Sequence, residues 1–305
     1  MTPKDLPQDL VFFERGWLSS NTVLLRGDDP VVIDSGHTSH AKLLASLIQH
    51  RLGPQAPTKL INTHLHSDHC GGNAHLLDIW PQLDTWVPQR VLNATNMWDE
   101  HRLTFADLGQ HCPRFKAQSP LEAGQTLLLN KRVWEIHDGP GHDADSVLLF
   151  APHERILISA DALWENGFGV LFDALQNLSG FDQQEKTLDL IESLNAQWVL
   201  PGHGGPFNDI KSAITRARGR LAHWRHEPQS HAQHAAHVLI KFHLMVRQSI
   251  AVAHLLQWAQ EVRLLQRIHQ DFHGEDTFDT WFMHRIESLC LKKALRMKQG
   301  HVIDV

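Results

Sequence analysis

The 305-residue sequence has no tyrosine, only three cysteines, and no apolar run of the length that crosses a membrane. Cys70, Cys112 and Cys290 are scattered without CxxC spacing, which argues against a disulfide framework and fits a reduced cytosol. The first residues, MTPKDLPQDLVFFERG, lack the basic and apolar segments of a signal peptide. We therefore expect a cytoplasmic protein with no membrane partner.

The remaining composition is that of a globular protein. Hydrophobic residues make up 42% of the chain and charged residues 20%, and no low-complexity run interrupts them. The one marked excess is histidine, with 24 residues. A histidine motif is therefore informative only when it is dense, and an HxHxDH string would arise by chance in roughly one such chain in a hundred.

The segment INTHLHSDHCGG contains such a string. It places His64, His66, Asp68 and His69 within six positions, just after a predicted buried strand. Imidazole and carboxylate groups are common ligands of zinc and related divalent metals. Three later predicted strands also end in such groups, within IHDGPGHDADS, ILISADALW and WVLPGHGGP: His142, Asp161 and His203. Strand ends expose functional side chains in α/β sheets, so the sequence predicts a metal site with seven ligands.

Strands and helices alternate over the first two thirds of the chain, which predicts a layered α/β fold. A helix that ends at Gly53 carries an apolar face, and a second amphipathic helix spans 181–196. The apolar face of the first helix is predicted to consist of Leu43, Leu44, Leu47 and Ile48. A polar stretch at 81–119 interrupts the alternation. We expect a lid insertion there, with a helix that presents Trp98, His101 and Phe105 on one side.

The chain becomes helical after Pro206, which predicts a catalytic domain at 1–207 and a smaller helical domain at 208–305. Residues 1–207 contain 14 Lys and Arg against 25 Asp and Glu, whereas residues 208–305 contain 14 against 9. The two predicted domains therefore have opposite net charges.

The motifs THLHSDH, GPGHDADS, SADA and PGHGGP, in this order, resemble the metal motifs of the metallo-β-lactamase-fold hydrolases, and VVIDSG resembles the Asp-x-Gly turn of the same family. The resemblance implies an αββα four-layer sandwich with two metal ions along one edge. It also implies a division of the ligands: His64, His66 and His142 for the first ion, Asp68, His69 and His203 for the second, and Asp161 as the bridge.

A site for two divalent ions indicates a hydrolase that uses a metal-bound hydroxide, because zinc lowers the pKa of bound water to about 7. We expect zinc, with iron or manganese as alternatives. The hydroxide would attack an acyl carbon, and Asp68 would orient it or move its proton. Asp34 is a candidate to hold a ligand histidine by its ring N–H.

The predicted substrate is a small molecule with a thioester, ester or lactone bond. Asp161 replaces the cysteine of one major β-lactamase group, and the absence of tyrosine argues against lactonases that use a tyrosine hydroxyl. Glyoxalase II is the nearest small-molecule comparison. Asp145-Ser146 stands where those enzymes often have Gly-His, which argues against glutathione as the thiol.

Two other activities remain open. The segment after 207 resembles the small winged-helix-like tail of a subgroup of this superfamily, with LKKALRMKQGHVIDV as the wing, and this keeps a nuclease or phosphodiesterase acting on RNA or DNA as an alternative. The acidic catalytic part favours a small acyl substrate over a nucleic acid. A single iron at His64, His142 and Asp161 would instead suit a persulfide dioxygenase-like reaction. A homodimer is also open.

Several further features are given ordinary structural roles. The loop WENGFGVLF at 164–172 fits core packing and a substrate wall equally well. Cys70 is expected to be a buried structural cysteine. A helix with four histidines is expected to present a solvated face and no metal site, because no carboxylate or cysteine accompanies them: His231, His234, His237 and His243.

Overall fold

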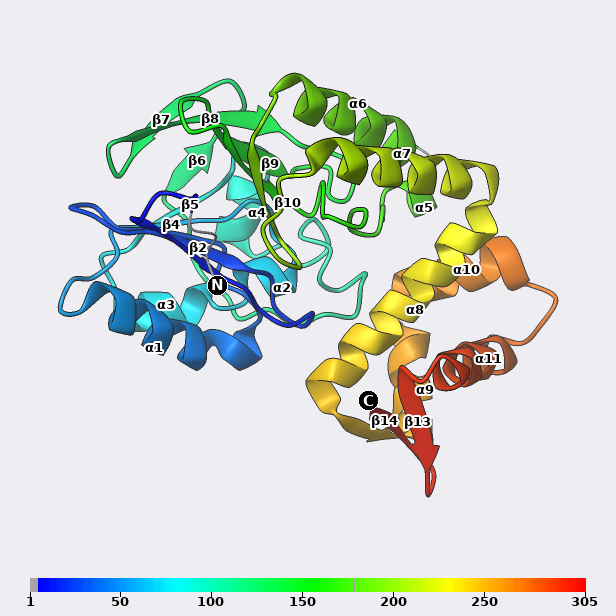
Figure 1. Cartoon of the computed structure of the whole chain (residues 1–305). Helices are drawn as coiled ribbons and strands as arrows, with labels where there is room; N and C mark the ends of the chain where they lie inside the picture. The colour runs from blue at the N-terminus through cyan, green and yellow to red at the C-terminus, as the bar shows by residue number, and fades with distance from the viewer. Residues whose placement is uncertain (1–4, 178) are drawn as a thin grey trace. The chain divides into compact units, whose positions relative to one another are not determined.

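The computed structural model describes residues 5–177 and 179–305 (Figure 1). The chain divides into two compact units. The first unit contains 1–103 and 112–222, and the second contains 104–111 and 223–305. The second unit therefore begins beyond the predicted boundary near 207. The reason is helix α7 (Ile210–His226), in which Arg218 forms ion pairs of 2.8 Å with Asp189 and Glu192 of α6 (Ser179–Ser193).

Two mixed sheets form the first unit. The six-stranded sheet has the order β1 (Leu10–Phe13), β2 (Thr22–Leu25), β3 (Val31–Ile33), β4 (Lys59–Ile61), β5 (Asp84–Pro88) and β6 (Ser119–Leu121). The five-stranded sheet has the order β11 (Trp198–Pro201), β10 (Ile156–Ala160), β9 (Val147–Ala151), β8 (Arg132–Asp138) and β7 (Thr126–Leu129). The strands β2 and β3 pair antiparallel and form a hairpin around the turn at 27–30.

The alternation of apolar side chains along the strands fixes the layers of this unit. Leu10 and Phe12 of β1 point into the core between the two sheets, where they meet Trp134 and Ile136 of β8. Val11 and Phe13 point the other way, toward a second core. That second core lies under α1 (Ala41–Leu52) and α3 (Asn73–Ile79), whereas α6 and α7 cover the other sheet (Figure 1). The predicted αββα sandwich is confirmed.

The helix predicted to end at Gly53 forms as α1, with one correction to its apolar face. Leu44 and Ile48 are buried, and Gly53 ends the helix with φ 66°. Leu43 was placed on the same face but is 54% exposed. The small Ala41 and Ala45 complete the buried stripe instead, because they lie on the side of the helix that meets the sheet.

The stretch 81–119 differs from its prediction. It begins with a regular strand, β5, and its helix is the short α4 (Leu92–Met97). Trp98 ends α4 with φ 58° in the left-handed region, and turns follow. Trp98 and Phe105 are buried while His101 is exposed, so the predicted helical stripe is wrong. Because residues 104–111 belong to the second unit, the stretch is not one insertion, and a lid role stays a prediction.

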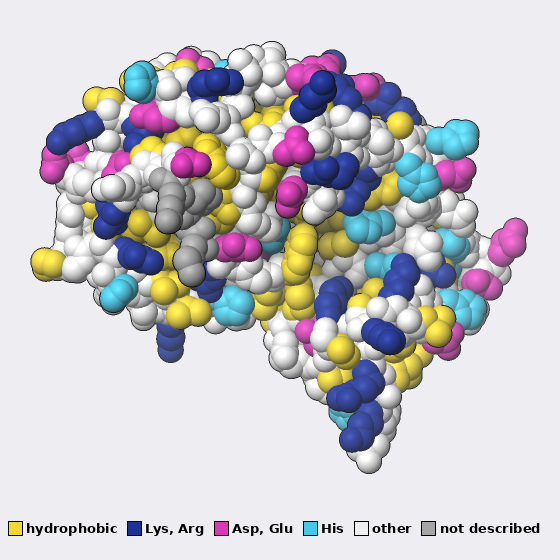
Figure 2. Space-filling model, viewed as in Figure 1, with side chains coloured by type: hydrophobic (Ala, Val, Ile, Leu, Met, Phe, Trp, Pro, Cys, Tyr) yellow, Lys and Arg dark blue, Asp and Glu magenta, His cyan; other side chains and the backbone are white. Residues whose placement is uncertain are grey.

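The second unit is mostly helical and ends in a β-hairpin. Its elements are α8 (Pro228–Arg247), β12 (Ser249–Ala251), α9 (Val252–Glu261), α10 (Arg263–His273), α11 (Phe278–Leu291), β13 (Leu295–Lys298) and β14 (His301–Asp304). The strands form one sheet in the order β12-β14-β13. The hairpin β13–β14 lies where the sequence predicted a wing. Lysine and arginine side chains gather over it (Figure 2), and those exposed there are Lys292, Lys293, Arg296 and Lys298.

The histidines of α8 were predicted to face solvent, which is wrong: two of the four are buried and the other two are partly buried. His231 is 1% exposed and His237 is 7% exposed. The rings of His231 and His234 lie 4.6 and 5.1 Å from Trp224, and that of His243 stacks on Trp258 at 4.0 Å. These imidazoles serve as packing groups against tryptophans, and among the described residues they form no metal-ligand group.

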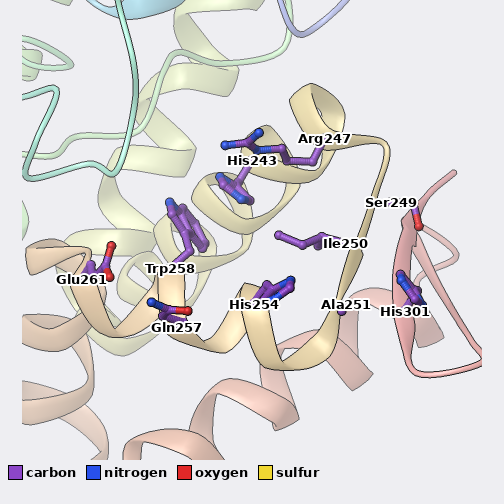
Figure 3. Close-up of a pocket in the computed structure, with 10 residues that line it drawn as sticks. All are labelled: His243, Arg247, Ser249, Ile250, Ala251, His254, Gln257, Trp258, Glu261 and His301. Carbon is purple, nitrogen blue, oxygen red and sulfur yellow. The ribbon is translucent and has the colours of Figure 1, made fainter.

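A hollow of about 630 Å³ lies beside the stack of His243 on Trp258 (Figure 3). Arg247, His254, His301 and the acidic Glu261 also line it. The lining belongs wholly to the second unit and shares no residue with the predicted metal ligands. Within the ranges 5–177 and 179–305, no helix is long and apolar enough to cross a membrane.

Candidate metal centre

The seven predicted ligands lie together in the first unit, at the ends of strands. His64 and His66 follow β4, and Asp68 and His69 lie on the short helix α2 (Ser67–Cys70). His142 follows β8, Asp161 follows β10, and His203 follows β11. The side chains form two groups, and within each group the potential ligand atoms lie within 4.8 Å of one another. We name them the triad (His64, His66, His142) and the tetrad (Asp68, His69, Asp161, His203).

The triad is a buried set of imidazoles. His64 is fully buried, and His66 and His142 are 5% and 7% exposed. His66 Nδ1 lies 2.8 Å from His142 Nε2. The His142 Nδ1–H donates to the backbone carbonyl of Val170 at 2.6 Å, which leaves Nε2 without a proton and able to bind a metal.

The tetrad combines two carboxylates with two imidazoles. His203 Nε2 lies 3.1 Å from Asp68 Oδ2, and His69 Nε2 lies 3.3 Å from Asp161 Oδ1. The side chain of Asp68 is 13% exposed, more than that of any other tetrad member. Asp68 is therefore the member that a solvent molecule or substrate reaches most easily.

Asp161 lies between the two groups. Its Oδ1 faces His69, while its Oδ2 lies 3.4 Å from His142 of the triad and 3.7 Å from His203 of the tetrad. The carboxylate can thus serve both groups at once, which is the position that a bridging ligand requires.

Asp34 forms hydrogen bonds that hold the predicted ligands in place. Its Oδ2 accepts a hydrogen bond from His69 Nδ1 at 2.8 Å, as the sequence predicted for a ligand histidine. The same carboxylate accepts hydrogen bonds from the backbone N–H and the hydroxyl of Thr63, at 2.9 and 2.8 Å. Asp34 therefore fixes the ring of His69 and the backbone just before His64.

Two observations show that a cation fits this arrangement. His64 Nε2 is buried and has no hydrogen-bond partner among the described residues, although such an atom is costly to leave unsatisfied. Two glycines also make room for the ligands. A Cβ at Gly202 would lie 2.1 Å from Asp161 Oδ1, and one at Gly169 would lie 2.4 Å from His142 Nδ1. These groups could therefore hold metal ions.

The electrostatics differ between the two groups. Burial lowers the pKa of His66 and of His142 to about 4, and burial also lowers the pKa of His64 well below its usual range. The triad is thus neutral at pH 7, the form that binds metals. Burial also lowers the pKa of His69, but the carboxylates of Asp161, Asp34 and Asp68 outweigh it and hold this pKa well above its usual range. The tetrad therefore favours a positive charge at its centre.

Aromatic side chains border both groups. Phe172 lies against His66 and His142, with ring centroids 5.5 and 5.6 Å away. Trp164 donates its indole N–H to Asp161 Oδ1 at 3.2 Å. The loop 164–172 thus lines the site with both of its ends, while Phe168 inside it is 1% exposed and belongs to the core. Sequence reasoning had left this loop undecided between a wall and a core.

Trp17 was missed by the sequence analysis. Its ring stacks on His203 at a centroid distance of 5.3 Å and an angle of 11°. It lies in the loop between β1 and β2, where no periodicity or ligand spacing marks it. Trp17 reaches the site only because the fold brings it next to His203, which is far away in the sequence.

Comparisons with known proteins identify a matching family and several relatives. The model of the metallo-beta-lactamase superfamily matches residues 15–203. The chain is 25% identical over 206 residues to an atrochrysone carboxyl ACP thioesterase of Cryptosporiopsis sp. (strain 8999), covering 67% of this chain and 53% of that protein. It is 28% identical over 189 residues to a hydroxyacylglutathione hydrolase of Synechococcus sp. (strain JA-3-3Ab), covering 61% of each. The chain thus spans less than two thirds of either relative.

The solved structures agree on the fold. A metallo-beta-lactamase family protein from Thermus thermophilus superposes with a TM-score of 0.57 at 18% identity, covering 97% of this chain and 98% of that protein. At this identity the likeness shows the fold alone.

Proposed function

Because the chain belongs to the metallo-beta-lactamase superfamily, we propose that it is a metal-dependent hydrolase that cleaves a thioester, ester or lactone bond of a small acyl molecule. The observation that carries this proposal is the position of Asp161 between the triad and the tetrad. Two divalent cations close together repel each other, and a shared carboxylate offsets that repulsion. We expect two ions, zinc in preference to iron or manganese.

Divalent ions at such a site lower the pKa of a bound water and polarise a carbonyl group. The side chains of the protein do the remaining work. The neutral triad and the tetrad would hold the ions, and Asp161 would serve both. Asp68, whose side chain is 13% exposed, would accept a hydrogen bond from the attacking water and hold it toward the acyl carbon. Phe172 and Trp164 would limit the access of other water molecules.

A thioester is the first substrate class to test, because one reported relative is named as a thioesterase and the other as a hydrolase of hydroxyacylglutathione. The thiol part of the substrate is expected to differ from glutathione. Asp145 replaces the pattern common in glyoxalase II, and its Oδ2 is held by Arg102 Nη1 at 2.6 Å.

The experiment begins with elemental analysis of protein purified without added metal, followed by assays on a panel of thioesters, lactones, phosphodiesters and persulfides. We expect close to two divalent ions per chain and the highest rate on a thioester. The Asp161→Ala variant should lose metal and nearly all activity. A matched control is Asp84→Asn, because Asp84 accepts a hydrogen bond from Trp86 in β5 and touches no ligand.

Other results would replace the proposal. One iron per chain with oxygen uptake on a persulfide would identify a dioxygenase, and phosphodiester cleavage without thioesterase activity would identify a nuclease. An Asp161→Ala variant that kept both ions and its full rate would remove the bridging role.

A further inference from the structure

Trp17 is the one aromatic residue among the exposed large hydrophobic side chains of the described chain, with 61% of its surface exposed. Exposure of so large an apolar surface is unfavourable in water, so it raises the question of what covers it. It lies directly at the tetrad, because its ring is nearly parallel to that of His203. Trp17 stacks on His203, yet 61% of its surface stays exposed and can meet a bound molecule.

A second indole stands at the side of the first. The ring of Trp164 meets Trp17 edge to face, at 5.4 Å and 68°, and meets His203 at 5.2 Å and 75°. Trp164 is itself fixed, because its N–H donates to Asp161 and its backbone N–H donates to the Gly167 carbonyl at 2.7 Å. The two indoles and the imidazole form an aromatic corner beside the ligands.

The loop that carries Trp17 is tied to the metal-binding segments rather than free. The Asn21 side chain donates to the carbonyls of Pro201 and Gly204 at 2.9 and 2.8 Å, and its backbone N–H donates to the carbonyl of Gly202. The Ser20 N–H donates to the Asp68 carbonyl at 2.9 Å. These bonds hold the loop on both sides of the tetrad, so the position of Trp17 is set by the same backbone that sets the ligands.

We propose that Trp17 is a specificity-determining residue that binds a planar aromatic or conjugated ring of the acyl substrate, with Trp164 as the side wall of this platform. This rests on the proposed hydrolase function for the identity of the bond that is cleaved. Aromatic rings gain attraction from offset stacking beyond the burial of their area. An indole face also attracts organic cations, but divalent ions in the adjoining tetrad would repel such a cation.

Binding tests the platform without requiring catalysis. The probes are 2-naphthoate and its saturated analogue decahydro-2-naphthoate, titrated calorimetrically into the metal-replete protein. We expect naphthoate to bind more tightly, and Trp17→Leu to weaken it by about 3- to 10-fold while changing the saturated analogue less. Trp17→Phe should retain most of the preference. Leu43→Ala, which removes an exposed apolar side chain on α1, should leave both affinities unchanged.

Hydrolysis gives a second readout. The ratio of kcat/KM for a naphthoyl thioester to that for an acetyl thioester should fall by a similar factor in Trp17→Leu, mainly through KM, while metal content stays near two ions per chain. Equal preferences in the wild type and Trp17→Leu, in both binding and hydrolysis, would overturn the platform. If no thioester, ester or lactone is cleaved but naphthoate binding still depends on Trp17, the hydrolase proposal fails and the platform stands.

Discussion

His69 Nδ1 lies 2.8 Å from the Oδ2 atom of Asp34, which is 35 positions earlier in the chain. Asp34 directly follows β3 with a φ of 58°, and its carboxylate contacts His69 of α2 and Thr63 after β4. One carboxylate thus orients a ligand ring and, through Thr63, the backbone before His64. Asp34 therefore helps to fix the geometry of both the triad and the tetrad, although it belongs to neither.

We predict that Asp34→Asn weakens zinc binding by roughly 10- to 100-fold, because loss of a partner behind a ligand histidine has effects of that size. Competition with a chromophoric chelator measures the affinity. Asp84→Asn is the matched control, since Asp84 accepts an indole N–H away from the site. Equal zinc affinity in Asp34→Asn and the wild type would show that zinc binding does not depend on orientation of the His69 ring by Asp34.

Gly202→Ala tests the space between Asp161 and His69. The added Cβ would lie 2.1 Å from Asp161 Oδ1 and 2.9 Å from His69 Cε1, so one of these side chains must move. We expect metal content to fall toward one ion or fewer per chain and activity to fall at least about tenfold. Gly205→Ala is the control, because its Cβ would approach nothing closer than 3.7 Å. Full metal content in Gly202→Ala would contradict the proposed ligand role of this pair.

Metal removal should destabilise the first unit. Ions that bind only the folded chain stabilise it by about 4 kcal/mol at a thousandfold excess over Kd. We therefore expect chelation to lower the midpoint temperature of the thermal unfolding of the first unit by about 5 °C or more, and added zinc to restore it. Asp161→Ala should respond to neither treatment. A wild-type transition that ignores both would argue against bound ions.

The buried histidines of α8 predict acid sensitivity of the second unit. Burial lowers the pKa of His231 to about 3 and that of His237 to about 4. These folded-state pKa values lie below the ordinary 6.5. The contribution of the two neutral histidines to folding stability is therefore fully present above pH 6.5 and is lost as the pH falls toward 4. Urea unfolding followed at pH 7, 6, 5 and 4 measures this loss.

The variant His231→Gln isolates one of these groups, because glutamine does not titrate. We expect it to be less stable than the wild type at pH 7, since His231 packs on Trp224, but to lose less stability between pH 6.5 and 4. An identical dependence on pH in both proteins would show that His231 is not a source of the acid sensitivity. His153→Gln, in which an exposed histidine is replaced, serves as the control.

The amino-acid sequence determined those features of the protein that depend on local pattern. The strands β2, β3 and β8–β11, the helices α1 and α6 and the candidate metal ligands follow from periodicity, turn residues and dense spacing within a few positions. Asp34 was also named from the sequence, because a carboxylate commonly accepts the ring N–H of a metal-binding histidine.

The tertiary structure decided the rest, because those features depend on contacts between distant residues. Trp98 adopts a left-handed conformation that ends α4 and buries its ring against Phe115, which its helical spacing did not predict. His231 is buried against Trp224 of α7, and His243 is partly buried against Trp258 of α9. Trp17 reaches His203 only because the loop after β1 is bonded to the turn after β11. Periodicity reports which face of an element is apolar, but the partner that covers that face is set by the packing of the whole chain.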